Sequence, residues 1–423
     1  MRDSLDEFRT FNRPFARRNP ELMRHKIARM SDNAFAFFRG TFHLFARDVL
    51  SGVIPPMPTA GATQLPLVGD IHSENYGTYK ADDGKVHYDI NDFDETTTGR
   101  FDFDITRLAT SLFLASRDRA DALDVAVGVA MSAVTHYTTR LPRILTKKIP
   151  ESDVSESAPT GCLPLDTLVQ TTATAKRPPF VERITEYKNK KRTLIRSPRY
   201  FNLPDAEREQ AVRLLGYYRK HQKDLPDKPD AFAVEDVCGR VSGIGSMGRY
   251  RYVLLLAGKG SAEARNLLLE FKEARPSAYD LYRDRDTDDA ALAHRAEHVI
   301  GMQRLSQAAS NRYLGSARDG SLSFQVRQLG PHDARLDTKP LERHDLDDLG
   351  RIQMAILARV HARSVGRAVG PSNPLAELAD PEAFCQRVLS LVLGYADVVH
   401  TDYKRFVGAR ADLDRVEEWM AVR

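Results

Sequence analysis

The sequence predicts an α+β protein, mostly helical, in which a strand-rich segment lies between two helix-rich segments. Apolar residues recur at helical spacing over residues 21–50, 104–140, 343–365 and 380–423. They alternate, as in strands, over residues 234–272. A chain of 423 residues is also too long for one small core. The length favours two domains or two lobes.

The first part of the chain is expected to contain helices and short strands. Residues 21–50 are predicted to be helical. Strands are expected at 65–68 and 86–91, joined through residues 80–85, where Asp83-Gly84 is typical of a hairpin turn. The next helix is expected from Asp104 to about Arg140.

The middle of the chain is predicted to be irregular at first. Residues 141–200 are rich in Lys, Arg, Pro, Ser and Thr and have weak periodicity, which is typical of a connector. Helices are expected at 205–220 and 288–309, and a strand at 324–329. The expected organisation is a helical segment with the acidic motifs (1–150), a basic connector plus helix (151–230), a small β-rich lobe (231–335) and C-terminal helices that complete the helical lobe (336–423).

The composition limits the class of protein. The net charge is only +4, so a general role in binding polyanions does not follow. The three cysteines are far apart and fit a reducing compartment. The N-terminal residues are charged and lack the apolar region of a signal peptide, and no run of apolar residues is long enough to span a membrane. A cytoplasmic protein is therefore expected.

Two acidic motifs near the N-terminus have the spacing of a kinase catalytic site. Asp70 and Asn75 are five residues apart, like the catalytic Asp and the metal-binding Asn of a kinase catalytic loop. Asp92-Phe93-Asp94 follows a predicted strand, where a kinase places a metal-binding aspartate. Carboxylate and amide oxygens are the ligands that Mg²⁺ prefers. We therefore predict that Asp70 is a catalytic base and that Asn75, Asp92 and Asp94 bind Mg²⁺ or Mn²⁺.

These acidic motifs also have other interpretations. Asp and Asn often cap turns, but the acids Asp89, Asp92, Asp94 and Glu95 all lie close to one strand end, which favours a functional site. His72 and His87 are either ligands or structural hydrogen-bonding residues. Gly69-Asp70-Ile71-His72 also resembles the first segment of a metallophosphatase site. The Gly-Asp-x-x-Asp and Gly-Asn-His-Glu segments that such a site needs do not occur in the sequence.

A glycine-rich loop lies much later in the chain. Gly243, Gly245 and Gly248 have a spacing that kinases and Rossmann folds share. A strand-like run follows this loop, whereas a Rossmann loop opens a helix, so the kinase interpretation is favoured. Lys272, at the end of the next strand, matches the kinase lysine that holds phosphates. The predicted nucleotide-binding residues are Gly243, Gly245, Ser246, Gly248, Lys272 and Glu297. Glu297 is the candidate partner of Lys272, with Gln303 and Glu273 as alternatives.

The order of these motifs is the reverse of the order in a protein kinase, where the glycine loop and lysine come first. The sequence therefore predicts a protein-kinase-like two-lobe fold with a circularly permuted order, or else a different fold. In the permuted fold the helix ending near His361 packs beside the Asp70 loop, and Lys272 and Asp92 face one cleft. Asp104 is predicted to brace the Asp70 loop. His361 and Arg363 either face the cleft or are cations at a helix end.

Several motifs together resemble an uncharacterised bacterial family called domain of unknown function 2252. They are FAFFRG (35–40), GDIHSENYG (69–77), NDFDET (91–96), DITRLATS (104–111), GIGSMG (243–248), LEFKEA (269–274), VRQL (326–329) and VHARS (360–364). The resemblance spans nearly the whole chain and implies a relation to protein-kinase-like and aminoglycoside-phosphotransferase-like folds. Val68 departs from the broader kinase pattern, which has His there; this removes a structural hydrogen bond rather than a catalytic group.

The expected function is phosphoryl transfer from ATP, with Mg²⁺ or Mn²⁺, to a small-molecule acceptor. Nucleotidyl transfer on the same fold and a nucleotide-binding pseudokinase or regulatory module are the alternatives. The basic run Lys188–Arg192, near Tyr187 and Tyr200, is a further candidate for nucleic-acid binding. A charge run is usually a solvated face, so a nucleic-acid partner is not expected.

Overall fold

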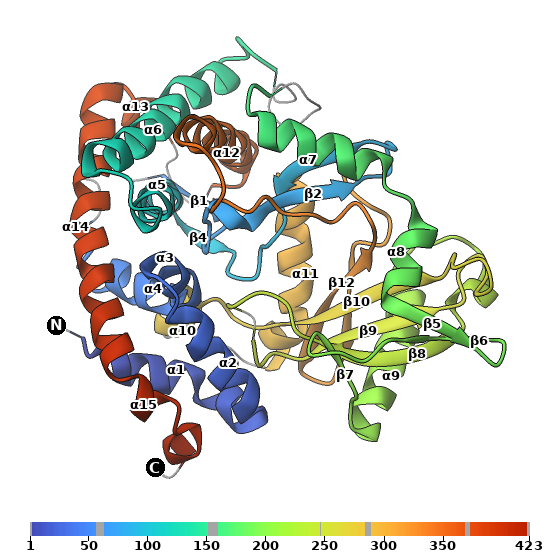
Figure 1. The fold of residues 1–423 in the computed structure, drawn as a ribbon. Helices are drawn as coiled ribbons and strands as arrows, with labels where there is room; N and C mark the ends of the chain where they lie inside the picture. Colours follow the sequence, from blue (N-terminus) through green and yellow to red (C-terminus); the bar gives the residue numbers. More distant parts are fainter. Residues whose placement is uncertain are drawn as a thin grey trace.

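The computed structural model describes residues 2–55, 63–150, 160–245, 247–283, 289–368 and 373–420. They form a helical part and a six-stranded sheet, with helix α11 between the two (Figure 1). The helices are α1 (Ser4–Arg18), α2 (Pro20–Met30), α3 (Ala34–Gly40), α4 (Phe42–Leu50), α5 (Phe101–Asp118), α6 (Leu123–Leu145), α7 (Leu163–Thr174), α8 (Arg177–Ile184), α9 (Asp205–His221), α10 (Ala278–Tyr282), α11 (Asp289–Ser306), α12 (Arg343–Ser364), α13 (Pro374–Glu377), α14 (Pro381–Gly408) and α15 (Arg410–Leu413). The strands are β1 (Gln64–Leu67), β2 (Tyr76–Lys80), β3 (Val86–Ile90), β4 (Thr97–Arg100), β5 (Thr185–Lys188), β6 (Lys191–Leu194), β7 (Tyr200–Phe201), β8 (Val234–Arg240), β9 (Arg251–Leu256), β10 (Leu267–Ala274), β11 (Gly315–Asp319) and β12 (Leu322–Leu329). The prediction of a mostly helical α+β protein is confirmed.

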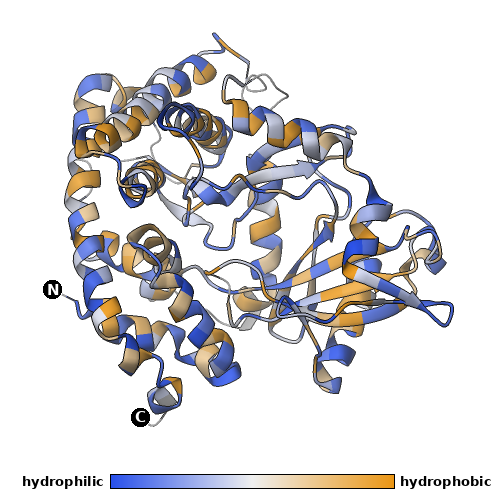
Figure 2. Cartoon of the chain, in the orientation of Figure 1, coloured by the Kyte–Doolittle hydropathy of each residue, from blue (hydrophilic) through white to orange (hydrophobic). Residues whose placement is uncertain are grey.

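The helical part is built from both ends of the chain. Helix α12 packs against α6, and α14 packs against α5 and α6. One continuous apolar core joins buried residues of the first 169 residues to residues such as Ile356, Val388 and Trp419. Apolar residues gather on the helix faces that point toward one another and on the sheet strands (Figure 2). Among the described helices, none combines the length and apolarity needed to cross a bilayer.

The six-stranded sheet is antiparallel throughout, in the order β11-β12-β10-β9-β8-β7. Leu254 and Phe271 lie on its outer face, where they pack against residues of α9 such as Leu214. On the inner face, Val253 and Leu268 pack against α8 and the β5–β6 hairpin. The rest of the inner face is left for polar residues, because side chains alternate between the two faces of a strand.

Two predictions for the N-terminal region need correction. The helix expected at 21–50 is divided into α2, α3 and α4, since the Asn33 side chain accepts the Ala36 N–H at 2.7 Å and starts a new helix. The turn at 80–85 is confirmed, but β3 pairs with β2 and not with β1, which pairs with β4. A hydrogen bond of 2.9 Å from Asn91 N–H to the Asn75 carbonyl closes the base of the β2–β3 hairpin. This bond brings the two acidic motifs together.

The irregular connector predicted at 141–200 is largely wrong. Its residues 151–159 lie outside the described part, but the remainder contains the end of α6, then α7, α8 and three strands. Buried Val181 and Leu194 give α8 and β6 a face to pack on the sheet, which periodicity alone did not reveal. Strand β11 was also missed, and the helix expected at 104–140 breaks between α5 and α6 at Ala120, whose φ is 63°. Helices α9 and α11 and strand β12 confirm their predictions.

Candidate functional site

The loop 68–75, which carries Asp70, is held by α5. The Asp104 carboxylate accepts the N–H groups of Val68 at 2.8 Å and Gly69 at 3.0 Å, so its predicted bracing role is confirmed. Gly69 has a φ of +84°, and a Cβ added there would lie 2.2 Å from the Glu95 carbonyl oxygen. The loop therefore needs glycine at this position, because it passes directly against the acidic turn.

Helix α12 supports the same loop from behind. His361 is fully buried; its Nε2 lies 3.4 Å from Asp104 Oδ2, and its Nδ1 is hydrogen-bonded to the Tyr137 hydroxyl at 2.7 Å. The predicted packing of this helix beside the Asp70 loop is confirmed. The alternative that His361 faces the cleft is wrong. Arg363 also points elsewhere, since it donates to the Gln307 carbonyl at 2.7 Å, just beyond the end of α11.

Asp70 is paired with a buried arginine. Arg107 of α5 donates to Asp70 Oδ1 from Nε at 2.9 Å and from Nη2 at 2.5 Å. The Arg107 guanidinium lies 4.0 Å from the ring centre of Phe38 and is fully buried. Burial raises the pKa of Asp70 to about 6, although Arg107 acts in the opposite direction. Both bonds go to Oδ1, and no described residue bonds to Oδ2.

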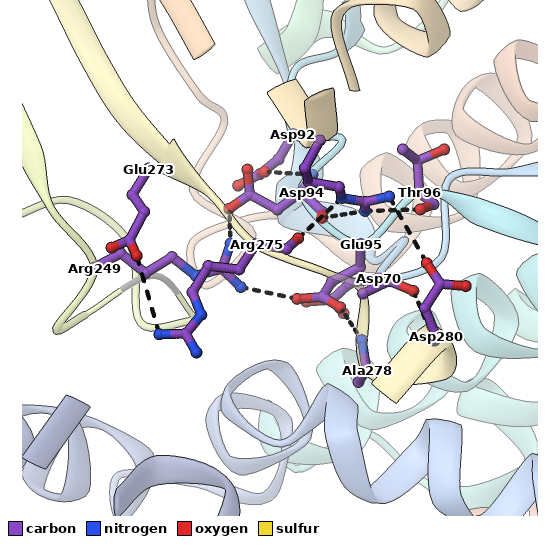
Figure 3. A network of polar contacts seen from close by, with 12 residues as sticks. Asp70, Asp92, Asp94, Glu95, Thr96, Arg249, Glu273, Arg275, Ala278 and Asp280 are labelled. Atoms are coloured by element: carbon purple, nitrogen blue, oxygen red, sulfur yellow. Dashed lines mark hydrogen bonds and ion pairs between the residues drawn. The ribbon is translucent and has the colours of Figure 1, made fainter. Parts of the chain in front are cut away.

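The acidic turn, defined here as residues Asp92–Glu95, lies between β3 and β4, and Arg249 points toward it (Figure 3). Lys272 Nζ on β10 lies 3.1 Å from Asp92 Oδ1 and 2.6 Å from Asp94 Oδ2. Arg249, which follows the glycine loop, contacts Asp94 Oδ2 at 3.1 Å and Glu95 Oε1 at 2.9 Å. Lys272 and Asp92 also line one cavity, so the prediction that they face the same space is confirmed.

The four acids near the end of β3 have different environments. Asp89 is fully buried, and Arg359 of α12 donates to both of its oxygens, at 2.7 and 2.6 Å, so Asp89 is structural. Glu95 accepts the Ala278 N–H at 2.7 Å in addition to Arg249. Asp94 is bound by Lys272, Arg249 and Gln325, the last at 2.7 Å. Asp92 keeps 28% of its side chain exposed and lines the cleft.

Charge also distinguishes Asp92. Burial alone would raise its pKa, but Lys272 and then Arg335 outweigh burial and hold the pKa below its usual value. Asp92 is therefore ionised at neutral pH. Asn75 lines the cleft together with Asp92, and its Nδ2 donates to the Asp70 carbonyl. Within the described part of the chain, no group donates to Asn75 Oδ1, which leaves this oxygen for a ligand.

The glycine loop joins β8 to β9, as the strand pattern predicted. Gly243 and Gly245 line the same cleft as Asp70, Asn75 and Asp92. Ser246 lies outside the described residues. Gly248 has a φ of +90°, and a Cβ there would meet Phe15 Cβ of α1 at 2.7 Å. The loop is therefore enclosed between the N-terminal helices and the cleft.

The prediction that Glu297 pairs with Lys272 is wrong. Glu297 lies on the exposed side of α11, where it contacts His294 at 2.8 Å. Arg295, two residues earlier and so on another face of the helix, points inward and donates to the carbonyls of Asp94 at 2.9 Å and Thr96 at 2.8 Å. The alternative partner Glu273 is bound to Arg18 at 2.6 Å. Gln303 lines a small cavity with Lys272 but donates to Gln307.

A second charged group lies on the inner sheet face beside Lys272. Glu270 is fully buried and contacts Arg327 at 2.7 Å, Arg251 at 3.4 Å and Arg240. We call these four residues the arginine cluster. Arg251 and Arg327 line the cavity that also contains Lys272 and Asp92.

The cleft formed by these elements has about 730 Å³ of space unoccupied by protein atoms, including open solvent. Sequence reasoning missed Arg107, Arg249, Arg335 and Lys26, which line it or support its residues. Arg107 lies in the DITRLATS motif, one turn after Asp104, and Arg249 follows Gly248 directly, so both had a signal. Lys26 and Arg335 had none, because each lies outside the motifs.

The fold and cleft define an α+β protein with opposed charged surfaces between a helical lobe and a sheet lobe. A family model described as "Uncharacterized protein conserved in bacteria (DUF2252)" matches residues 18–409, so the chain belongs to this family. The resemblance expected from the motifs is thereby confirmed for the family itself. No curated protein and no solved structure matches the chain.

Proposed function

We propose that this protein transfers a phosphoryl group from ATP, with Mg²⁺, to a small-molecule acceptor, on a circularly permuted kinase-like fold. One observation carries the proposal: Lys272 Nζ lies 3.1 Å from Asp92 Oδ1, with Gly243 lining the same cavity. In kinases the phosphate-binding lysine, the metal-binding aspartate and the glycine loop converge in this way on one triphosphate. Here they converge although 180 residues separate Asp92 from Lys272.

The motif order supports a permutation. Helix α12 ends beside the Asp70 loop, through His361 and Asp104, although 257 residues separate these two side chains. The sheet supplies the glycine loop between β8 and β9 and the lysine on β10, the order that a kinase uses within its small lobe. The conventional glutamate partner of the lysine is replaced, because Asp92 and Asp94 hold Lys272.

The residues present fit a magnesium ion that is completed by phosphate oxygens. No group of three or more His, Cys, Asp or Glu side chains in the described ranges could hold a metal by itself. Mg²⁺ commonly uses one or two protein carboxylates together with substrate phosphates and water, and here Asp92 and Asn75 Oδ1 would hold it. When bound, the ion would neutralise charge on the transferred phosphoryl group.

The remaining residues have roles that follow from their positions. Asp70 would accept the proton of the acceptor hydroxyl, since its Oδ2 has no described partner, and a pKa of about 6 leaves it ionised at neutral pH. Lys272 would exchange its carboxylate contacts for phosphate oxygens. Gly243 and Gly245 would cover the phosphates and exclude water.

Nucleotidyl transfer is a second candidate that one observation favours. Arg107 donates two hydrogen bonds to Asp70 Oδ1, and these stabilise the carboxylate and oppose the rise in the Asp70 pKa that burial causes. A reaction in which Asp70 only orients groups, with ATP bound in reverse, would tolerate this contact. A pseudokinase that binds nucleotide without transfer remains the non-enzymatic alternative.

A thermal-shift screen with ATP, GTP and ADP, each with and without Mg²⁺ or Mn²⁺, tests the proposal. We expect a nucleotide to raise the melting temperature only when a divalent metal is present, because binding to the folded state stabilises it. Mass spectrometry of acceptor candidates then separates phosphoryl from nucleotidyl transfer by the added mass. The absence of any shift at millimolar ligand would remove the basis of all three interpretations.

A further inference from the structure

A buried lysine that none of the motifs includes lies at the Asp70 end of the cleft. Lys26 of α2 is 1% exposed and lines the cleft together with Asp70, Glu95 and Gly245. Its Nζ donates to Asn12 Oδ1 at 2.8 Å, and Asn12 is itself fixed by donating to the Phe8 carbonyl at 2.8 Å. An ammonium group has three donors, so one bond does not satisfy it.

Two other cations that line this cleft have a carboxylate partner. Arg39 contacts Glu74 at 2.6 Å, and Arg249 contacts Asp94 and Glu95. Lys26 has no such contact with any residue that the structure describes. Burial lowers the pKa of Lys26 to about 7, with Arg249 acting in the same direction and Glu95 and Asp70 opposing it. A buried amine in this state gains most from a ligand that brings its own negative charge.

A second observation points to a ligand at the same place. His43 of α4 lines the cleft and is 1% exposed, and its Nε2 is buried without a hydrogen-bond partner. Its ring is stacked on Phe11 with ring centres 4.2 Å apart, which holds the plane of the imidazole. Arg39 Nε is likewise buried without a partner in the same wall. Buried polar atoms of this kind are rare unless a ligand or water completes them.

We propose that Lys26 and His43 bind an anionic group of the acceptor, so that the substrate is a small hydroxyl compound carrying a phosphate or carboxylate. This inference rests on the proposed function for the role of Asp70. The hydroxyl lies at Asp70 and the anionic group lies deeper, against α2 and α4. Lys272 and the arginine cluster remain on the opposite side for the nucleotide.

The anion site can be tested without knowledge of the acceptor. Inorganic phosphate is titrated into the protein, and the melting temperature is measured at each concentration. We expect phosphate to stabilise the wild type at millimolar concentration. Lys26→Met should weaken phosphate binding about tenfold or more, because an ion pair in a buried site is lost. Acetate in a parallel titration distinguishes a carboxylate site from a phosphate site. The variant Arg24→Met is the control, since Arg24 lies on the same helix but pairs with exposed Glu21 at 3.1 Å.

The nucleotide site is separated by a second variant. Lys272→Met should keep the phosphate shift and lose the Mg–ADP shift, whereas Lys26→Met should do the reverse; cooperative melting and an unchanged far-UV circular dichroism spectrum confirm folding. Three results would overturn the inference. The phosphate-induced rise in melting temperature could survive in Lys26→Met, or it could be lost only in Lys272→Met. The wild type could also show no rise with either phosphate or acetate. A wild type that responds to phosphate but not to Mg–ADP would instead contradict the proposed function.

Discussion

Residues of the arginine cluster and of the acidic turn line one small cavity, and the two groups have opposite charge balances. In the arginine cluster, three guanidinium groups surround the single carboxylate of Glu270. In the acidic turn, three carboxylates share two cations, Lys272 and Arg249. The sheet side thus has unused positive charge and the loop side has unused negative charge. Lys272 belongs to the sheet, but its ion pairs are with the acidic turn.

The difference in charge between the two groups suits them to bind different kinds of ion. A wall with excess guanidinium charge favours phosphate oxygens, whereas a turn with excess carboxylate charge favours a divalent cation. A magnesium nucleotide presents both kinds of charge at once. The two regions are therefore complementary to the ligand that we propose, and variants that alter one region at a time can separate their contributions.

The largest effect is expected from Glu270→Gln. The change leaves three guanidinium groups around a neutral amide, and removing one partner of a buried ionic group costs about 3–5 kcal/mol of the free energy of unfolding. Urea denaturation measures this loss. Glu263→Gln is the matched control, because Glu263 is 66% exposed in the β9–β10 turn and should change stability by less than about 0.5 kcal/mol. Equal stability of the two variants would mean that Glu270 does not hold the cluster.

The second effect concerns two acids of the loop side. Asp70→Asn should lower transfer about 100-fold or more and leave Mg–ATP binding nearly unchanged, because a base acts on the acceptor. Asp92→Asn should instead weaken Mg–ATP binding about tenfold or more, since it removes a metal ligand. Calorimetric titration and a turnover assay separate the two. Asp82→Asn, in the exposed β2–β3 turn, is the control, and identical behaviour of the Asp70 and Asp92 variants would contradict the assigned roles.

The third effect tests whether Lys272 restrains the acidic turn. Lys272→Met frees Asp92 and Asp94 from their common cation, so Mn²⁺ alone should bind about tenfold more tightly to the variant than to the wild type. Mg–ATP should bind less tightly, because the phosphate contact is lost. Electron paramagnetic resonance of free Mn²⁺ measures the first change. Lys259→Met, at an exposed turn, should behave as the wild type, and unchanged Mn²⁺ affinity in Lys272→Met would show that the turn has no latent cation site.

Motif spacing predicted the parts of the site that depend on short segments. Asp70, Asn75, Asp92, Lys272 and the glycine loop were found from the sequence. Asp70 and Asn75 line the cleft, Lys272 lines the small cavity, and Asp92 and Gly243 line both. The prediction for Glu297 was wrong because a shift of one or two positions along a helix changes which side chain faces inward. The inward face is set by how the helix packs. Lys26 could not be found, since its neighbours come from separate helices. The hydrogen bond from Asn91 N–H to the Asn75 carbonyl, which extends the pairing of β2 with β3, likewise has no signal in the periodicity.

The ion pair between Asp89 and Arg359 also has a consequence for how the chain folds during synthesis. The two residues are 270 positions apart, so the acidic hairpin leaves the ribosome long before its arginine has been translated. Until α12 emerges, Asp89 has no such partner and the helical lobe lacks a central helix, so this lobe cannot complete its folding from the N-terminus onward. A nascent chain stalled before residue 343 should therefore leave the 68–95 segment open to proteases, while the full-length chain protects it. Because its parts lie far apart in the sequence, the site is one of the last regions to become native, and contacts between residues so far apart predict slow folding.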